Sequence, residues 1–111
     1  QFIVHLISDE AQKMGIETMT YATVGPDVIL CIPKKDNPDF CEFIALEIET
    51  GKMLDNPNQL SEKTGKNNNG KYKEWWFVVT NKDDRKQYEK HHQTLIRTEV
   101  QDFLRRALNG S

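Results

Sequence analysis

The chain has 111 residues, of which 37% are hydrophobic and 29% are charged, and its formal net charge is −2. This length allows one domain with a buried core and excludes a second, and the composition excludes a disordered chain. The charge excludes a polycation, so a nucleic-acid partner would need a local basic surface.

The first half of the chain predicts a helix followed by three strands. A helix is expected first because apolar residues recur at helical spacing before a glycine, namely Ile3, Leu6, Ile7, Ala11, Met14 and Gly15. Segments 16–24, 27–32 and 41–50 are apolar or rich in β-branched and aromatic residues, which favours strands. The polar segment 33–40 then joins the last two strands as a hairpin connection.

The second half alternates helices and strands. A helix is predicted over 54–66, entered through Asp55 or Asn56 with Pro57 in its first turn. After a loop at 67–71, residues 74–80 give the strongest strand signal, with Trp75 and Trp76 pointing to opposite faces. A charged surface helix over 83–93, a short edge strand over 94–96 and a final helix follow. Thr98 and Gln101 have capping-box spacing at its start.

This order predicts the fold class and the extent of the domain. A strand meander followed by helical crossovers indicates an α/β fold, with a mixed sheet of about four to five strands flanked by helices. At least one strand pair should be parallel. We expect a single domain over 1–108, with 109–111 as a tail, and the abrupt start in QFIVHLI indicates a piece of a larger protein.

The apolar segments and the two cysteines indicate the cellular setting. No apolar segment approaches the ~20 residues that span a bilayer, so no membrane partner is expected. Cys31 and Cys41 fall in predicted strands, without a Cys-rich scaffold or a signal segment. This pattern favours reduced thiols in a cytoplasmic protein over a disulfide.

Two acids stand where the third predicted strand should be buried. Glu47 and Glu49 share one strand face with Phe43 and Ala45, which we expect to be buried. Neighbouring buried carboxylates are costly, because each raises the pKa of the other. A compensating partner is therefore expected, such as a divalent metal ion; the alternative is an exposed face whose acids are solvated.

A third acid is brought close by the predicted hairpin. If segments 27–32 and 41–50 pair across the polar connection, Asp27 lies beside the end that carries Glu47 and Glu49. Three carboxylates would then supply the oxygen ligands that Mg²⁺ prefers. The simpler alternative is that Asp27, which follows Pro26, is only a turn residue.

Pro26-Asp27 followed by Glu47-Ile48-Glu49 resembles the motif of the PD-(D/E)XK phosphodiesterases, a family with the restriction-endonuclease-like fold. The order of elements over about residues 1–108 is also similar, especially to small archaeal and mobile-element nuclease domains. The resemblance implies that Asp27 and Glu47 bind Mg²⁺ or Mn²⁺. Glu49 replaces the usual lysine and would serve as an additional metal ligand. Glu10 matches the inward acid of the first helix and would bind the metal directly or through water. Members of the family are often dimers, which makes a homodimer a further expectation.

The departure at Glu49 leaves the source of the lysine charge open. Lys52 just after the strand, or Lys63 or Lys66 on the next helix, would supply it from a displaced position. Of these lysines we take Lys52, which is nearest to the motif in the sequence, to complete the expected catalytic set of Asp27, Glu47, Glu49 and Lys52. Four lysines around the NNNG loop are candidates for phosphate contacts, with a plain solvated loop as the equal alternative: Lys63, Lys66, Lys71 and Lys73.

The resulting hypothesis is a metal-dependent nuclease that hydrolyses DNA phosphodiester bonds. In such a site the metal lowers the pKa of a bound water and neutralises charge on the phosphorus oxygens. Two alternatives stay open. One is an inactive nuclease-fold module that binds DNA or a protein partner, and the other is a structural accessory domain with solvated acids.

Overall fold

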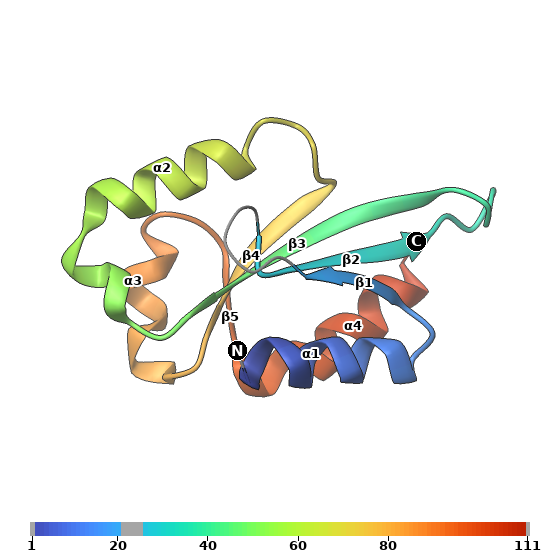
Figure 1. Ribbon diagram of the computed structural model, residues 1–111, viewed down its shortest axis with the longest axis horizontal. Coiled ribbons are helices and arrows are strands. Elements are labelled where there is room, and N and C mark those ends of the chain that lie inside the picture. Colours follow the sequence, from blue (N-terminus) through green and yellow to red (C-terminus); the bar gives the residue numbers. More distant parts are fainter. Residues whose placement is uncertain (1, 21–25, 111) are drawn as a thin grey trace.

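The computed structural model describes residues 2–20 and 26–110, which form one five-stranded sheet covered by helices on both faces (Figure 1). The elements in chain order are α1 (Phe2–Lys13), β1 (Glu17–Thr20), β2 (Val28–Pro33), β3 (Cys41–Glu49), the 3₁₀ turn η1 (Lys52–Asp55), α2 (Pro57–Asn67), β4 (Glu74–Val79), η2 (Lys82–Asp84), α3 (Arg85–Glu89), β5 (Thr94–Ile96), η3 (Arg97–Glu99) and α4 (Val100–Asn109). The predicted α/β class is confirmed. Within the two described ranges, every helix is too short or too polar to cross a bilayer.

The strands lie side by side in their chain order, from β1 to β5. The pairs β1–β2 and β2–β3 are antiparallel, whereas β3–β4 and β4–β5 are parallel. The parallel pairs follow from the helical connections α2 and η2–α3, since parallel neighbours need a crossover. In the β2–β3 hairpin Val28 lies opposite Leu46. This register brings Asp27 beside the end of β3 that carries the two glutamates.

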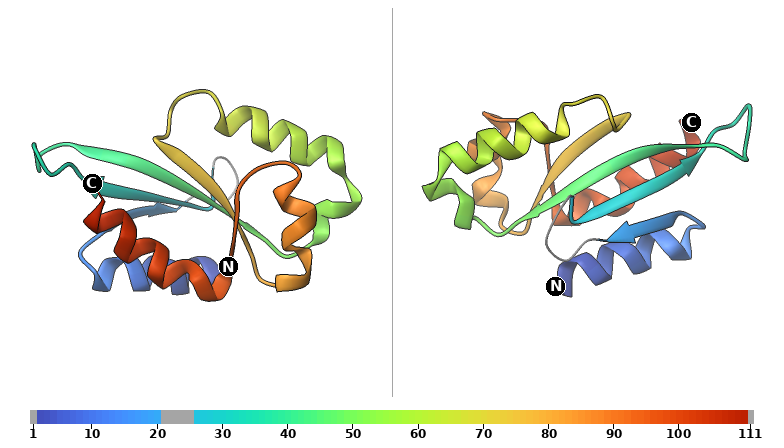
Figure 2. Two further views of the ribbon diagram at one scale, coloured as in Figure 1. Left: turned by 180° about the vertical axis from the view of Figure 1, so that it is seen from behind. Right: turned by 45° about the horizontal axis from the view of Figure 1, so that its top comes forward.

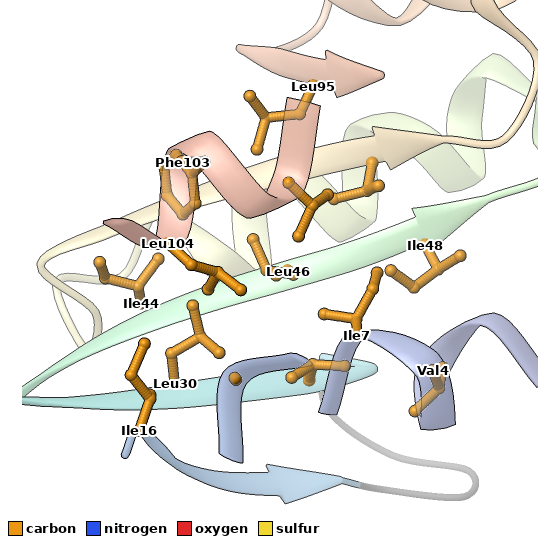
Figure 3. Packing of buried hydrophobic residues seen from close by; sticks show 14 of the residues in the cluster. Val4, Ile7, Ile16, Leu30, Ile44, Leu46, Ile48, Leu95, Phe103 and Leu104 are labelled. Atoms are coloured by element: carbon orange, nitrogen blue, oxygen red, sulfur yellow. The ribbon is translucent and has the colours of Figure 1, made fainter. Parts of the chain in front are cut away.

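Two layers of helices bury the two faces of the sheet (Figures 1 and 2). Helices α1 and α4 pack on one face, where Ile7, Leu46 and Leu104 belong to the larger core cluster (Figure 3). Helices α2 and α3 pack on the other, where Leu60 and Tyr88 meet side chains of β3 and β4. Because side chains alternate along a strand, the residues at 45, 47 and 49 of β3 all face the α2–α3 layer.

Several predicted boundaries are confirmed. Helix α1 ends at Lys13, just before Gly15, which has φ +82°, and the amide of Ile16 donates a hydrogen bond back to the carbonyl of Ala11. The side chain of Asn56 caps α2 by accepting a hydrogen bond from the amide of Gln59 at 3.3 Å. Trp75 is buried in the α2–α3 layer, and Trp76 packs on the opposite side.

Three predictions were wrong in detail, and two of them concern helices. The helix expected over 83–93 is shorter, because only η2 and α3 are helical and α3 ends at Glu89; His92 lies beyond that end and stacks on Trp75 at 3.7 Å between ring centroids. The last helix is not capped by Thr98 and Gln101; Glu99 Oε1 instead accepts from the amide of Ile96 at 2.9 Å.

The third correction concerns burial on the strand that carries the acids. Phe43, expected to be buried, is 38% exposed because α2 covers only the far end of β3. The strand predicted over 16–24 is observed as β1, and residues 21–24 lie outside the described residues.

Candidate active site

The two glutamates of β3 are held inside the protein. Glu47 and Glu49 are each only 4% exposed, on the strand face that is covered by α2. Their neighbour Ala45 on the same face is fully buried. The alternative of an exposed face with solvated acids is therefore excluded, and the carboxylates need partners.

Helix α2 supplies a cation and an amide to these carboxylates. The Nζ atom of Lys63 lies 3.3 Å from Glu49 Oε2 and 3.8 Å from Glu47 Oε1. The Nδ2 atom of Asn67 donates a hydrogen bond to Glu47 Oε2 at 2.8 Å. Lys63 and Asn67 are one helical turn apart, and the buried Leu60 anchors the same side of the helix. The helix therefore presents this pair to β3.

Asp27 joins the glutamates from the neighbouring strand, as the predicted hairpin requires. Its Oδ2 atom accepts a hydrogen bond from the amide of Ile48 at 2.8 Å. The charge of Asp27 also helps to raise the pKa values of Glu47 and Glu49. We call Asp27, Glu47 and Glu49 the acid cluster. In the described part of the chain, however, no three acidic, histidine or cysteine side chains converge closely enough to hold a metal ion.

Burial dominates the electrostatics of the acid cluster. It raises the pKa of Glu47 to about 7, although Lys63 and the hydrogen bond from Asn67 act in the opposite direction. Burial also raises the pKa of Glu49, again against the effect of Lys63. Burial acts to lower the pKa of Lys63, but the two glutamates outweigh it and the pKa is raised. One ammonium group thus only partly offsets the cost of burying the carboxylates.

The donor atoms of the acid cluster match a hard divalent cation in type, although the three carboxylates do not converge as a metal site within the described residues. All its donors are carboxylate oxygens, the ligands that Mg²⁺ and Mn²⁺ favour. Glu49 Oε1 is buried and has no hydrogen-bond partner among the residues that the structure describes. Such an atom has unused bonding capacity, which a cation would satisfy.

A cleft of about 590 Å³ opens beside the acid cluster. Glu47 and Asn67 lie on its wall together with three of the four lysines predicted to contact phosphate, Lys63, Lys66 and Lys71. We call this feature the lysine cleft. Tyr72 also lines it, and the Nζ atom of Lys71 lies 5.9 Å from the centroid of the Tyr72 ring. The three lysines outnumber the two acids of this wall, Glu47 and Glu62, so the cleft is suited to holding an anion.

Three other predicted site residues are not brought to this place. Glu10 lies on α1, in the opposite layer, and its carboxylate is 2.7 Å from Arg97 NH2. Lys52 is exposed in η1 and is not among the residues that line the lysine cleft. Lys73 pairs with Glu42 at 3.7 Å and borders a separate pocket next to α4. The structure therefore does not support Lys52 as the displaced lysine. Among the candidates for that role, Lys52, Lys63 and Lys66, only Lys63 contacts the acids.

Two further residues of the site were missed by the sequence analysis, Asn67 and Tyr72. Asn67 carried a usable signal, since it follows Leu60 and Lys63 at helical spacing. Tyr72 carried none, because it lies in the irregular segment between α2 and β4. Comparison of the chain with protein-family models, curated proteins and solved structures gave no match.

Proposed function

We propose that this chain is a metal-dependent deoxyribonuclease domain of the PD-(D/E)XK type, which hydrolyses phosphodiester bonds. The observation that carries the proposal is the position of Lys63. Its ammonium group contacts both buried glutamates and also lines a cleft with two more lysines. Carboxylates for a metal and cations for a phosphate backbone thus lie side by side, as phosphodiester hydrolysis requires.

The residues of the site take distinct roles in this proposal. Asp27, Glu47 and Glu49 would have to move closer together to hold Mg²⁺ or Mn²⁺, and such an ion would lower the pKa of water and offset phosphate charge. Asn67 fixes the orientation of the Glu47 carboxylate through its hydrogen bond. Lys63 supplies the positive charge of the missing motif lysine from α2, where it can stabilise negative charge that develops on the phosphate.

The DNA strand occupies the lysine cleft in this proposal. Lys66 and Lys71 contact the phosphates that flank the scissile one, because both line the cleft on the side of α2 and the following loop. The setting belongs to the same proposal: a cytoplasmic, DNA-processing protein of which this domain is one part, acting as a homodimer where both strands are cut.

The experiment is cleavage of supercoiled plasmid and linear DNA in Mg²⁺ or Mn²⁺. We expect the wild type to cut and the double variant Asp27→Ala, Glu47→Gln to lose the activity. Asp39→Asn, an exposed acid in the β2–β3 connection, is the matched control and should cut as the wild type does. Undiminished cleavage by the double variant would reject the proposal.

A second candidate function is a DNA-binding module of the same fold that no longer cuts. The contact of Lys63 with both glutamates favours it, since a cation already lies between the carboxylates. Such a module would bind DNA through the lysine cleft, yet titration with Mn²⁺ would show no binding. Metal titration and DNA affinity together therefore separate the two candidates.

A further inference from the structure

The lysine cleft is small and reaches a buried part of the sheet. Its volume of about 590 Å³ is in the range of pockets that enclose one small molecule. Its wall includes Glu47, which is only 4% exposed, so the inner end of the cleft lies below the protein surface. A double helix is too wide to enter such a space, whereas a single strand with unstacked bases can enter it.

An aromatic ring stands among the cations of the cleft. Tyr72 lines the cleft together with Lys63, Lys66 and Lys71. The Tyr72 side chain is half-buried and packs against the core cluster that contains Leu60, which holds the ring in place. A nucleobase of any kind can stack on such a ring while lysines contact the phosphates of the strand. In a duplex the bases are stacked on one another, so this arrangement suits an unpaired strand.

We infer that the lysine cleft binds single-stranded DNA, with one base stacked on Tyr72 and the flanking phosphates on Lys66 and Lys71. The inference rests on the proposed function, because it takes the cleft as the place where DNA binds. It goes further by naming the substrate as a single strand, such as a frayed end, a flap or a melted segment. It needs no metal ion, since stacking and phosphate contacts form with the strand alone.

The cations of the cleft are placed for a strand that passes over the Tyr72 ring. Lys63 is engaged by the two buried glutamates, so the phosphates next to the stacked base are left to Lys66 and Lys71. Lys66 lies in the last turn of α2, and Lys71 lies in the segment that follows. The 5.9 Å between Lys71 Nζ and the ring centroid is near the outer limit of a cation–π contact. The exposed Lys71 side chain can therefore move aside for a base and contact the adjoining phosphate.

The test is binding of labelled oligonucleotides, followed by fluorescence anisotropy in EDTA to prevent cleavage. The probes are a single-stranded thymidine oligonucleotide, an abasic sugar-phosphate chain of the same length, and a blunt, GC-rich duplex. We expect the wild type to bind the single strand about tenfold more tightly than either of the other probes. Tyr72→Leu should bind the single strand and the abasic chain equally, because the ring is lost. Tyr72→Phe is the matched control; it keeps the ring and should keep the preference.

Two results would overturn the inference. One is a wild type that binds the duplex or the abasic chain as tightly as the single strand. The other is an unchanged preference for the single strand in Tyr72→Leu that circular dichroism shows to be folded. If Tyr72→Leu unfolds, the comparison of the single strand with the abasic chain in the wild type and in Tyr72→Phe still decides the point.

The same measurements separate failure of the inference from failure of the proposed function. If the wild type cuts DNA and binds the duplex at least as tightly as the single strand, only the inference fails. If no oligonucleotide binds, the inference is overturned and both candidate functions fail with it. If the single strand binds through Tyr72 but DNA is never cut, the inference stands and the nuclease proposal gives way to the binding module.

Discussion

The carboxylate of Asp27 accepts a hydrogen bond of 2.8 Å from the backbone amide of Ile48, the residue between the two buried glutamates. The two residues lie on neighbouring antiparallel strands, so the bond ties the start of β2 to the end of β3. Asp27 is thereby positioned by the backbone of the protein itself. Its structural and its proposed metal-binding roles can be separated by substitution.

We expect Asp27→Asn and Asp27→Ala to differ in stability and to agree in activity. Asparagine keeps an oxygen that can accept from Ile48, so the free energy of unfolding should stay within about 0.5 kcal/mol of the wild type. Alanine leaves that amide without its acceptor and should cost about 1–2 kcal/mol. Both variants should lose DNA cleavage. Urea denaturation in EDTA measures the first difference, and equal stability of the two variants would contradict the role of the hydrogen bond.

The raised pKa of Glu47 predicts how stability depends on pH. Its pKa is about 7 in the folded protein against 4.5 ordinarily, so between these values the folded state binds a proton that the unfolded chain has released. Glu47 therefore lowers the free energy of unfolding as the pH rises from about 4.5 to about 7, by on the order of 2–3 kcal/mol. The raised pKa of Glu49 acts in the same direction.

The comparison that isolates this effect is Glu47→Gln, measured by urea unfolding from pH 5 to pH 8 in EDTA. Glutamine cannot ionise but can still accept the hydrogen bond from Asn67. We expect the variant to be more stable than the wild type at pH 8, with the difference shrinking toward pH 5. His92, whose pKa is lowered by burial, acts in the opposite sense in both proteins and cancels in the comparison. A constant difference across this range would contradict the assignment.

Local sequence patterns were sufficient to predict the order of the helices and strands and to place Asp27, Glu47 and Glu49 at the same end of the sheet. The alternation of side chains along 41–50 put Glu47 and Glu49 on one face, and the hairpin connection set where Asp27 would lie. These inferences needed only the neighbouring residues and one antiparallel pairing. They succeeded because both depend on short-range geometry.

The contacts that could not be predicted from the sequence depend on packing between elements that are distant in the chain. Glu10 meets Arg97, 87 residues away, and no local pattern indicates such a pair. The choice of Lys63 over Lys52 depends on how α2 is turned against β3, which is set by the burial of Leu60. Phe43 points to the same side of β3 as the buried Ala45, but it is exposed because α2 does not extend over it.

The pairing of Glu10 with Arg97 predicts that Glu10 is not a metal ligand. Glu10→Gln should leave Mn²⁺ affinity and DNA cleavage within about twofold of the wild type, because α1 covers the face opposite the acid cluster. The loss in stability should be about 1 kcal/mol or less, since both side chains of the pair are partly exposed. Isothermal titration with Mn²⁺ decides the point. Loss of metal binding would reinstate Glu10 as a ligand, as the resemblance implied.

The four lysines around the NNNG loop divide into two groups that DNA binding should distinguish. Lys63, Lys66 and Lys71 line the lysine cleft, whereas Lys73 is paired with Glu42 and borders another pocket. We expect Lys66→Met and Lys71→Met each to weaken binding of a DNA oligonucleotide. Each should also reduce the slope of log affinity against log salt by about one, because one phosphate contact and its released counter-ion are lost.

Lys73→Met is the control for that measurement, since it removes the same charge from the same loop region. Its affinity and salt slope should match those of the wild type, because the ion pair with Glu42 keeps the ammonium beside the strand and out of the cleft. Fluorescence anisotropy over a range of salt concentrations, in EDTA to prevent cleavage, gives both quantities. Equal losses for all three variants would indicate a diffuse basic loop rather than a strand held in the cleft, and the path proposed for DNA beside the glutamates would have to be abandoned.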